Sequence, residues 1–345
     1  MRKKFGFLLL ILTMLSAAGK LSAQAVGQIV RLDPGLDALI SPDAKIEKLA
    51  DGLGFLEGPV WVHSQNPGFL IFSDIPANVI RKWSSDGKVS VYLDKTGFTG
   101  ADADAADAGY QLDAGHGMVT LLGSNGVTFD KQGRVTYCQH GDHGIVRVEK
   151  DGKRTTLADK YEGKRLNSPN DLVYKSDGSL YFTDPPYGLR KAGDDPKKEL
   201  PFEGVYRWSN GKLQLLNQQF KAPNGIAFSP DEKYLYIDDS ASRTYWRFEV
   251  QPDGTIANGK LLVDMDKSKE EGVPDGMKID QKGNIYGAGP GGVWVMTADG
   301  KHLGTIKPPE DPANLAWGDA DGKTLYFTAR TGLYRLRMNV AGIRP

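Results

Sequence analysis

Asn224-Gly-Ile-Ala-Phe228 is the stretch that decides the fold, because it begins a unit that recurs along the chain. An oxygen-bearing side chain and a small residue precede an apolar–x–apolar run, which is typical of a half-buried strand. A turn at Ser229-Pro-Asp-Glu232 leads to a second strand, Tyr234-Leu-Tyr-Ile237. Thr244-Tyr-Trp-Arg-Phe248 predicts a third strand, and Asp253-Gly254 predicts the hairpin turn to a fourth.

The same five-residue start motif occurs in five other places, once with its amide displaced by one residue. These places are Glu57-Gly-Pro-Val-Trp61, Asn125-Gly-Val-Thr-Phe129, Asn170-Asp-Leu-Val-Tyr174, Asp275-Gly-Met-Lys-Ile279 and, with the displaced amide, Ala313-Asn-Leu-Ala-Trp317. Units of four short strands, repeated roughly every 40–65 residues, match a β-propeller better than a sandwich or a doubly wound fold. We therefore predict an all-β, six-bladed propeller with four-stranded antiparallel blades, in which Lys45–Leu49 adds the outer strand of the last blade and closes the ring.

Composition sets limits on function. The 345 residues are 40% hydrophobic and 25% charged, which suits a sizeable core. The formal net charge is +0, so nothing indicates nucleic acid or an anionic membrane surface as a partner. Cys138 is the single cysteine, which excludes an intrachain disulfide and a cysteine-rich zinc site. The sequence leaves the oligomeric state open.

The first residues are typical of a secretory signal peptide. A basic start at Arg2 to Lys4 precedes the apolar run Phe5–Leu15, and Ala23-Gln-Ala25 matches a cleavage pattern. We therefore expect residues 1–25 to be removed, residues 26–345 to form one domain, and the protein to be periplasmic or extracellular with no membrane attachment after cleavage.

Equivalent positions of repeated units come together when the units close into a ring. The first position of the start motif then surrounds the central channel with the oxygens of Glu57, Asn170, Asn224 and Asp275. Carboxylate and amide oxygens favour Ca²⁺ over Mg²⁺ or Mn²⁺, and Zn²⁺ is disfavoured because no His or Cys shares the position. The alternative is that Asn-Gly and Asp-Gly are ordinary turn residues. That alternative leaves Glu57 unexplained, because Glu is a poor turn former.

Four stretches in order resemble the SMP-30/gluconolactonase/LRE family over nearly the whole chain. They are Glu57-Gly-Pro-Val-Trp61, Asn167-Ser-Pro-Asn-Asp171, Pro223-Asn-Gly225 with Ser229-Pro-Asp231, and Pro274-Asp-Gly-Met277. The resemblance implies a six-bladed propeller that holds one Ca²⁺ and hydrolyses lactones or, in related branches, organophosphates. It implies that Glu57, Asn224 and Asp275 bind the metal, that Asp275 is the general base, and that Asn170 binds the metal or touches the substrate.

One departure from the animal branch of that family concerns substrate recognition. No arginine stands two residues before Asn170, and Arg165 is the nearest candidate. This places the chain closer to the bacterial gluconolactonase-like branch. We expect Asn125, Arg165, His140 and Tyr187 to contact substrate, although His140 could be structural and Tyr187 could pack under a turn.

Other hydrolase and cofactor motifs find no support. The chain has no G-x-S-x-G nucleophile motif, and a strand, not a helix, follows the G-x-G-x-x-G match at residues 287–292. We therefore expect a calcium-dependent hydrolase that opens a sugar lactone such as gluconolactone. The alternatives are an ester or organophosphate hydrolase on the same metal, or a non-catalytic propeller that binds a sugar or protein and has a structural metal.

Overall fold

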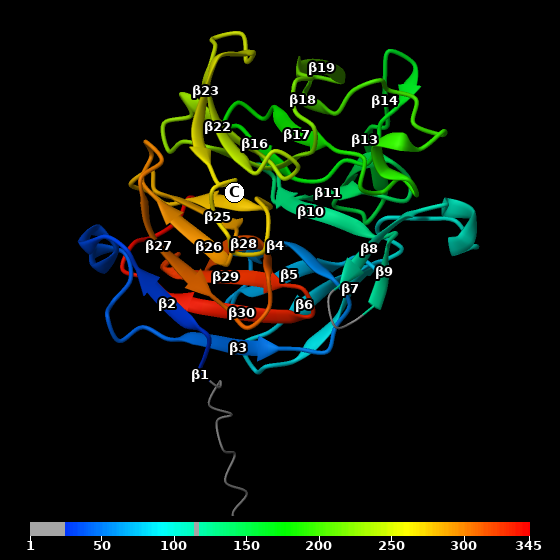
Figure 1. The fold of residues 1–345 in the computed structure, drawn as a ribbon. Helices are drawn as coiled ribbons and strands as arrows, with labels where there is room; N and C mark the ends of the chain where they lie inside the picture. Colours follow the sequence, from blue (N-terminus) through cyan, green and yellow to red (C-terminus); the bar gives the residue numbers. More distant parts are fainter. Residues whose placement is uncertain (1–24, 114–116) are drawn as a thin grey trace, which may run out of the picture.

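The computed structural model describes residues 25–113 and 117–345, and its six large sheets surround a central axis (Figure 1). Each large sheet is a blade whose first strand is innermost, and these first strands contact one another in ring order. The predicted six-bladed propeller with antiparallel blades is therefore confirmed.

The first three blades each have four strands. They are β4 (Leu56–Val62), β5 (Phe69–Asp74), β6 (Val79–Trp83) and β7 (Val89–Asp94); β10 (Ser124–Phe129), β11 (Val135–Gln139), β12 (Gly144–Val148) and β13 (Arg154–Ala158); and β16 (Leu172–Tyr174), β17 (Leu180–Asp184), β18 (Gly204–Ser209) and β19 (Lys212–Asn217). A short hairpin, whose strands β14 (Lys160–Tyr161) and β15 (Lys164–Arg165) have two residues each, lies between the second and third blades along the chain.

The last two blades take strands from the N-terminal part of the chain. Blade four comprises β20 (Pro223–Phe228), β21 (Tyr234–Asp239), β22 (Thr244–Val250) and β23 (Ile256–Asp264). Blade five comprises β24 (Met277–Ile279), β25 (Ile285–Gly289), β26 (Gly292–Met296), β27 (His302–Lys307) and β2 (Gln28–Arg31). Blade six comprises β28 (Pro312–Gly318), β29 (Thr324–Ala329), β30 (Gly332–Arg337), β3 (Ile46–Ala50) and β1 (Ala25–Val26). Figure 1 shows β3, in blue, beside β30, in red. The predicted closing strand is therefore confirmed as β3, and β2 extends the neighbouring blade.

A buried tyrosine at the same place in the second strand of four blades forms much of the core between blades. The four are Tyr181, Tyr236, Tyr286 and Tyr326, and each pairs with the fourth position of its start motif. Where the ring closes, Tyr326 of the last blade stacks on Trp61 of the first, with ring centroids 5.2 Å apart. Burial of such large rings contributes several kcal/mol to closure, at about 25 cal/mol per Å² of apolar area.

The described part of the insertion Thr99–Met118, between the first and second blades, contains regular structure. It contains η2 (Ala103–Ala106) and a hairpin of β8 (Gly109–Asp113) and β9 (Gly117–Leu121). Its Ala, Asp and Gly content indicates turns, but a backbone hydrogen bond from Gly109 N to Gly188 O, at 2.9 Å, supports the hairpin. A second insertion, Arg190–Phe202, is a loop with one short helix, η3 (Ala192–Asp194).

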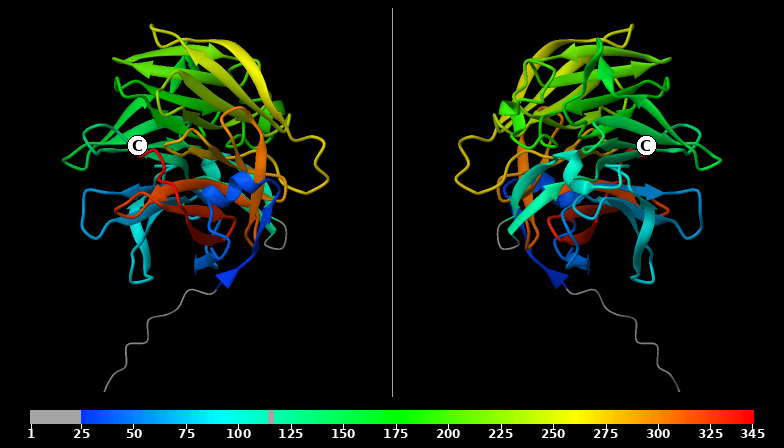
Figure 2. Two further views of the ribbon diagram at one scale, coloured as in Figure 1. Left: turned by 90° about the vertical axis from the view of Figure 1, so that its left-hand side faces the viewer. Right: turned by 90° about the vertical axis from the view of Figure 1, so that its right-hand side faces the viewer.

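The signal-peptide prediction stays a prediction, because residues 1–24 lie outside the described residues. The described part begins at Ala25, which pairs with Glu47. The helices that the structure describes are η2, η3 and η1 (Pro34–Ala38), and none of them is long and apolar enough to cross a membrane. Side views show the C terminus on one side of the propeller and the segment between β23 and β24 projecting on the other (Figure 2).

Candidate functional site

The start motif forms a β-bulge in four of the six blades. The register shifts between Glu57 and Val60 in β4, and at the equivalent place in β10, β20 and β28. A bulge leaves a residue unpaired and redirects its side chain. In the other two blades, Asn170 and Asp275 stand just before the first strand. The first-position side chains are thereby directed away from the sheets.

The glycine that follows in most start motifs is required by the close approach of neighbouring blades. A Cβ on Gly126 would lie 2.6 Å from the carbonyl oxygen of Asn170, and a Cβ on Gly225 would lie 2.4 Å from that of Asp275. Real Cβ atoms do not approach backbone this closely, because such overlap is strongly repulsive. The glycines therefore bring the first-position residues of adjacent blades together.

A cavity of about 280 Å³, here called the axial cavity, lies where these residues converge. Seven of the eight predicted site residues line it: Glu57, Asn125, His140, Asn170, Tyr187, Asn224 and Asp275. Arg165 does not line it. The Arg165 guanidinium donates to the carbonyl oxygen of Lys197 at 3.0 Å, within the second insertion.

Two carboxyl groups, the buried Glu57 and the partly buried Asp275, meet in the axial cavity. Glu57 is only 2% exposed, and its Oε2 accepts the Gly58 N–H at 2.6 Å. Burial, followed by the nearby charge of Asp171, raises the pKa of Glu57 to about 7. Burial, then the charges of Glu57 and Asp238, raise the pKa of Asp275 well above its usual value. Two neighbouring carboxyl groups repel each other when both are ionised, so Glu57 and Asp275 are expected to ionise together only when a cation lies between them.

Three amides present unpaired oxygens to the same cavity. Asn224 donates through Nδ2 to Ser240 Oγ at 3.0 Å, and the Asn125 amide nitrogen lies 3.3 Å from His140 Nε2. The Oδ1 atoms of Asn125, Asn170 and Asn224 are buried without a hydrogen-bond partner. Buried polar atoms are normally satisfied, so an unpaired set that faces one cavity indicates a ligand.

The residues present therefore fit a hard divalent cation. Ca²⁺ typically takes about six to eight oxygen ligands, and four of them can come from Glu57, Asn170, Asn224 and Asp275. The described residues contain no cluster of three or more His, Cys, Asp or Glu side chains suited to a metal. The donors here are two carboxylates with amides, a set that favours Ca²⁺ over Zn²⁺ and leaves positions for substrate or water.

His140 lies in the cavity as a neutral imidazole. It is 1% exposed, and burial followed by the nearby His143 lowers its pKa to about 3. Its Nδ1 atom is buried without a partner. A base this weak cannot hold a proton at neutral pH, so His140 can orient a hydroxyl group but contributes little as a general base.

The two insertions form a wall that the start motifs do not predict. Tyr110 and Gln111 from the first insertion, with Arg190 and Lys191 from the second, line the axial cavity. Asp107 joins the insertions through an ion pair with Arg190 at 2.9 Å. Sequence reasoning missed these residues, because nothing in either insertion indicates which side of the propeller it covers.

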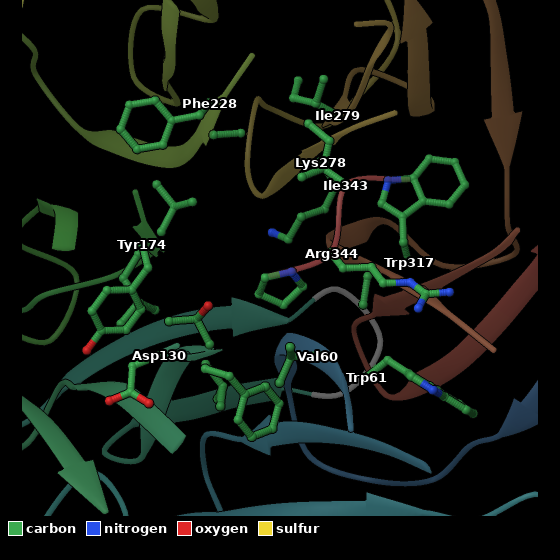
Figure 3. Close-up of a pocket in the computed structure, with 18 of the residues that line it drawn as sticks. Val60, Trp61, Asp130, Tyr174, Phe228, Lys278, Ile279, Trp317, Ile343 and Arg344 are labelled. Carbon is green, nitrogen blue, oxygen red and sulfur yellow. The ribbon is translucent and has the colours of Figure 1, made fainter. Parts of the chain in front are cut away.

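A larger cavity of about 510 Å³, here called the opposite cavity, lies at the other end of the channel (Figure 3). Strand residues such as Val60, Phe228 and Ile279 line it together with the C-terminal residues Ile343 and Arg344. None of the first-position oxygen donors reaches it. The larger volume therefore does not mark the site with the metal-binding chemistry.

Comparison with known proteins agrees with this geometry. The family model described as the SMP-30/gluconolactonase/LRE-like region matches residues 55–331. The chain belongs to this family. Residues 55–331 include every start motif, so the family match and the axial cavity involve the same part of the fold.

Individual relatives are similar over most of their length. The gluconolactonase of Zymomonas mobilis is 36% identical over 337 residues, which cover 95% of this chain and 90% of that protein. A solved gluconolactonase from Xanthomonas campestris is 32% identical with a TM-score of 0.77, covering 93% of this chain and 99% of that one. Bovine regucalcin is 27% identical over 286 residues, covering 80% of this chain and 84% of regucalcin.

Proposed function

We propose that this lactonase opens a sugar lactone in the axial cavity with the help of a bound Ca²⁺. The observation that carries the proposal is the convergence of two carboxyl groups, Glu57 and Asp275, and three unpaired amide oxygens on one cavity. Two relatives similar over more than nine-tenths of this chain are gluconolactonases. Regucalcin-like relatives indicate a family that binds divalent metals, and the oxygen donor set favours calcium.

The chain's own residues supply binding and proton transfer. Glu57, Asn224 and Asp275, with Asn170, would hold the cation beside the space that the substrate enters. When bound, the cation polarises the lactone carbonyl and stabilises the negative charge that develops on its oxygen. Asp275 accepts the proton of the attacking water, because His140 is too weak a base. Water adds to the carbonyl carbon, the ring C–O bond breaks, and the ring oxygen takes up the proton from Asp275 and becomes a hydroxyl group of the open-chain acid.

The wall of the cavity selects the substrate. Asn125 and His140 offer hydrogen bonds from one side, and Tyr187 stands beside Ser240 on another. The insertion residues Gln111 and Arg190 complete the wall. Such polar groups suit the hydroxyl groups of a sugar ring, because a buried donor or acceptor rejects an analogue that leaves it unpaired.

A substrate panel tests the proposal. Purified protein in calcium is assayed on glucono-1,5-lactone, an aliphatic lactone and paraoxon, together with Asp275→Asn and the exposed turn variant Asp253→Asn. We expect the sugar lactone to be the best substrate, Asp275→Asn to lose at least about 100-fold in kcat, and Asp253→Asn to retain activity. Preferential turnover of paraoxon would favour an organophosphate hydrolase, and substrate binding without turnover would favour a non-catalytic propeller.

We also propose that the enzyme acts in the periplasm or outside the cell. The support is the basic start, apolar run and Ala23-Gln-Ala25 pattern of residues 1–25. The buried Cys138 is the chain's single cysteine, so folding in an oxidising compartment requires no disulfide.

A further inference from the structure

The second position of the start motif defines a layer of the channel beside the axial cavity. Four blades have glycine there, and the other two have Asp171 and Asn314. The Asn314 side chain occupies the space that a side chain at Gly276 would fill, because a Cβ on Gly276 would lie 2.0 Å from Cγ of Asn314. Asp171 and Asn314 are 2% and 1% exposed, and Asn314 Nδ2 lies 3.4 Å from Asp171 Oδ2. The layer therefore contains two side chains, and they face each other.

Asn314 links this layer to a proposed cation ligand. Its Nδ2 donates to Glu57 Oε2 at 3.0 Å. Its Oδ1 accepts from the Leu315 N–H at 2.8 Å and from Lys278 Nζ at 3.0 Å. These bonds fix which end of the amide faces Glu57. Asn314 therefore acts on the cation only through Glu57, as a positioning residue.

Lys278 contributes a positive charge at the fourth position of its start motif. The residues at this position in the other five blades are uncharged. Lys278 Nζ lies 3.8 Å from Asp171 Oδ2, and its side chain is 29% exposed. Figure 3 shows its amine directed toward the open centre of the opposite cavity. Asp171 and Lys278 thus form a charge pair in the channel, between the proposed cation ligands and the opposite cavity.

We propose that this charge pair sets the affinity of the axial cavity for its cation. The negative charge of Asp171 strengthens cation binding, and the positive charge of Lys278 weakens it. The inference rests on the proposed function, because it requires a cation at Glu57 and Asp275. Charges buried in a channel are screened much less than surface charges. Partners of metal ligands typically change metal affinity by roughly 10- to 100-fold when they are altered.

Asp171 and Lys278 carry opposite charges, so their variants should change calcium affinity in opposite directions. This distinguishes an effect of charge from a loss of structural support. Calcium affinity is measured by calorimetric titration for Asp171→Asn, Lys278→Met, the double variant, and the exposed turn variant Lys282→Met, which makes the same change in net charge. We expect Asp171→Asn to bind calcium at least about 10-fold more weakly and Lys278→Met to bind several-fold more tightly. The double variant returns toward the wild-type affinity, because the two charge changes cancel, and Lys282→Met is unchanged.

A purely structural role predicts another pattern, in which both single variants bind more weakly and the double variant is the weakest. That pattern, or an unchanged affinity in Lys278→Met, overturns the inference while the wild type still binds calcium. A wild type that binds no calcium overturns the proposed function and the inference together. If Asp171→Asn fails to fold, Lys278→Met and the charge-preserving Lys278→Arg still decide, because only the methionine variant is expected to bind more tightly.

Discussion

Replacing His140 by glutamine should remove a large part of the protein's sensitivity to acid. Burial lowers the pKa of this imidazole from 6.5 to about 3. Between these pH values the unfolded chain binds a proton that the folded chain does not, so the free energy of unfolding falls as the pH falls below 6.5. From about pH 8 to about pH 5, this one group lowers the free energy of unfolding by about 2 kcal/mol. Glutamine keeps a polar group near Asn125 but cannot take up the proton.

Urea unfolding at both pH values, in the same saturating calcium, measures the effect. The wild type should lose about 2 kcal/mol more on acidification than His140→Gln. His63→Gln changes an exposed imidazole and should keep most of the wild-type loss. If His140→Gln loses as much stability as the wild type, the imidazole is not held neutral in the axial cavity, and its contact with Asn125 is wrong.

The remaining predictions concern the ring, the cation and export. Gly225→Ala should destabilise the protein by about 1–3 kcal/mol in urea unfolding, because its Cβ would lie 2.4 Å from the Asp275 backbone. Gly193→Ala, whose Cβ would make only an ordinary contact at 3.9 Å, should not destabilise it. Equal effects of the two substitutions would refute the close approach of the blades. Glu57→Gln should abolish the rise in melting temperature that calcium produces in the wild type, and a retained rise would remove Glu57 from the ligand set. Mass spectrometry of the exported protein should find a chain that begins near Val26, and an intact N terminus would contradict the signal-peptide prediction.

The repeated start motif made the fold and most of the candidate site predictable. Its first position lines the axial cavity in five of the six blades, so Glu57, Asn170, Asn224 and Asp275 could be placed together without knowledge of the blades' detailed packing. The sequence shows that glycine recurs at the second position of the start motif, but it does not show why glycine is needed there. The reason is the contact between neighbouring blades, as at Gly225 and the Asp275 carbonyl.

Features that depend on distant contacts were harder to predict. The strand β2 pairs with β27, nearly the whole chain away, and β1 has two residues, too few for a periodic pattern. Arg165 was chosen by its distance along the sequence from Asn170, yet the fold directs it to the Lys197 carbonyl. Asp171 stands where four of the other five motifs have glycine, and that departure was the available signal for the channel layer beside the axial cavity.

Removal and stoichiometric return of calcium tests whether lactone hydrolysis depends on one cation bound in the axial cavity. The purified enzyme is treated with chelator, transferred to metal-free buffer, and assayed on glucono-1,5-lactone while calcium is added in known amounts. We expect hydrolysis to fall to background and to return in full when one calcium ion per chain is bound, and we expect no return in Glu57→Gln at the same concentrations. Full activity in the chelated, metal-free wild type would show that the reaction needs no cation.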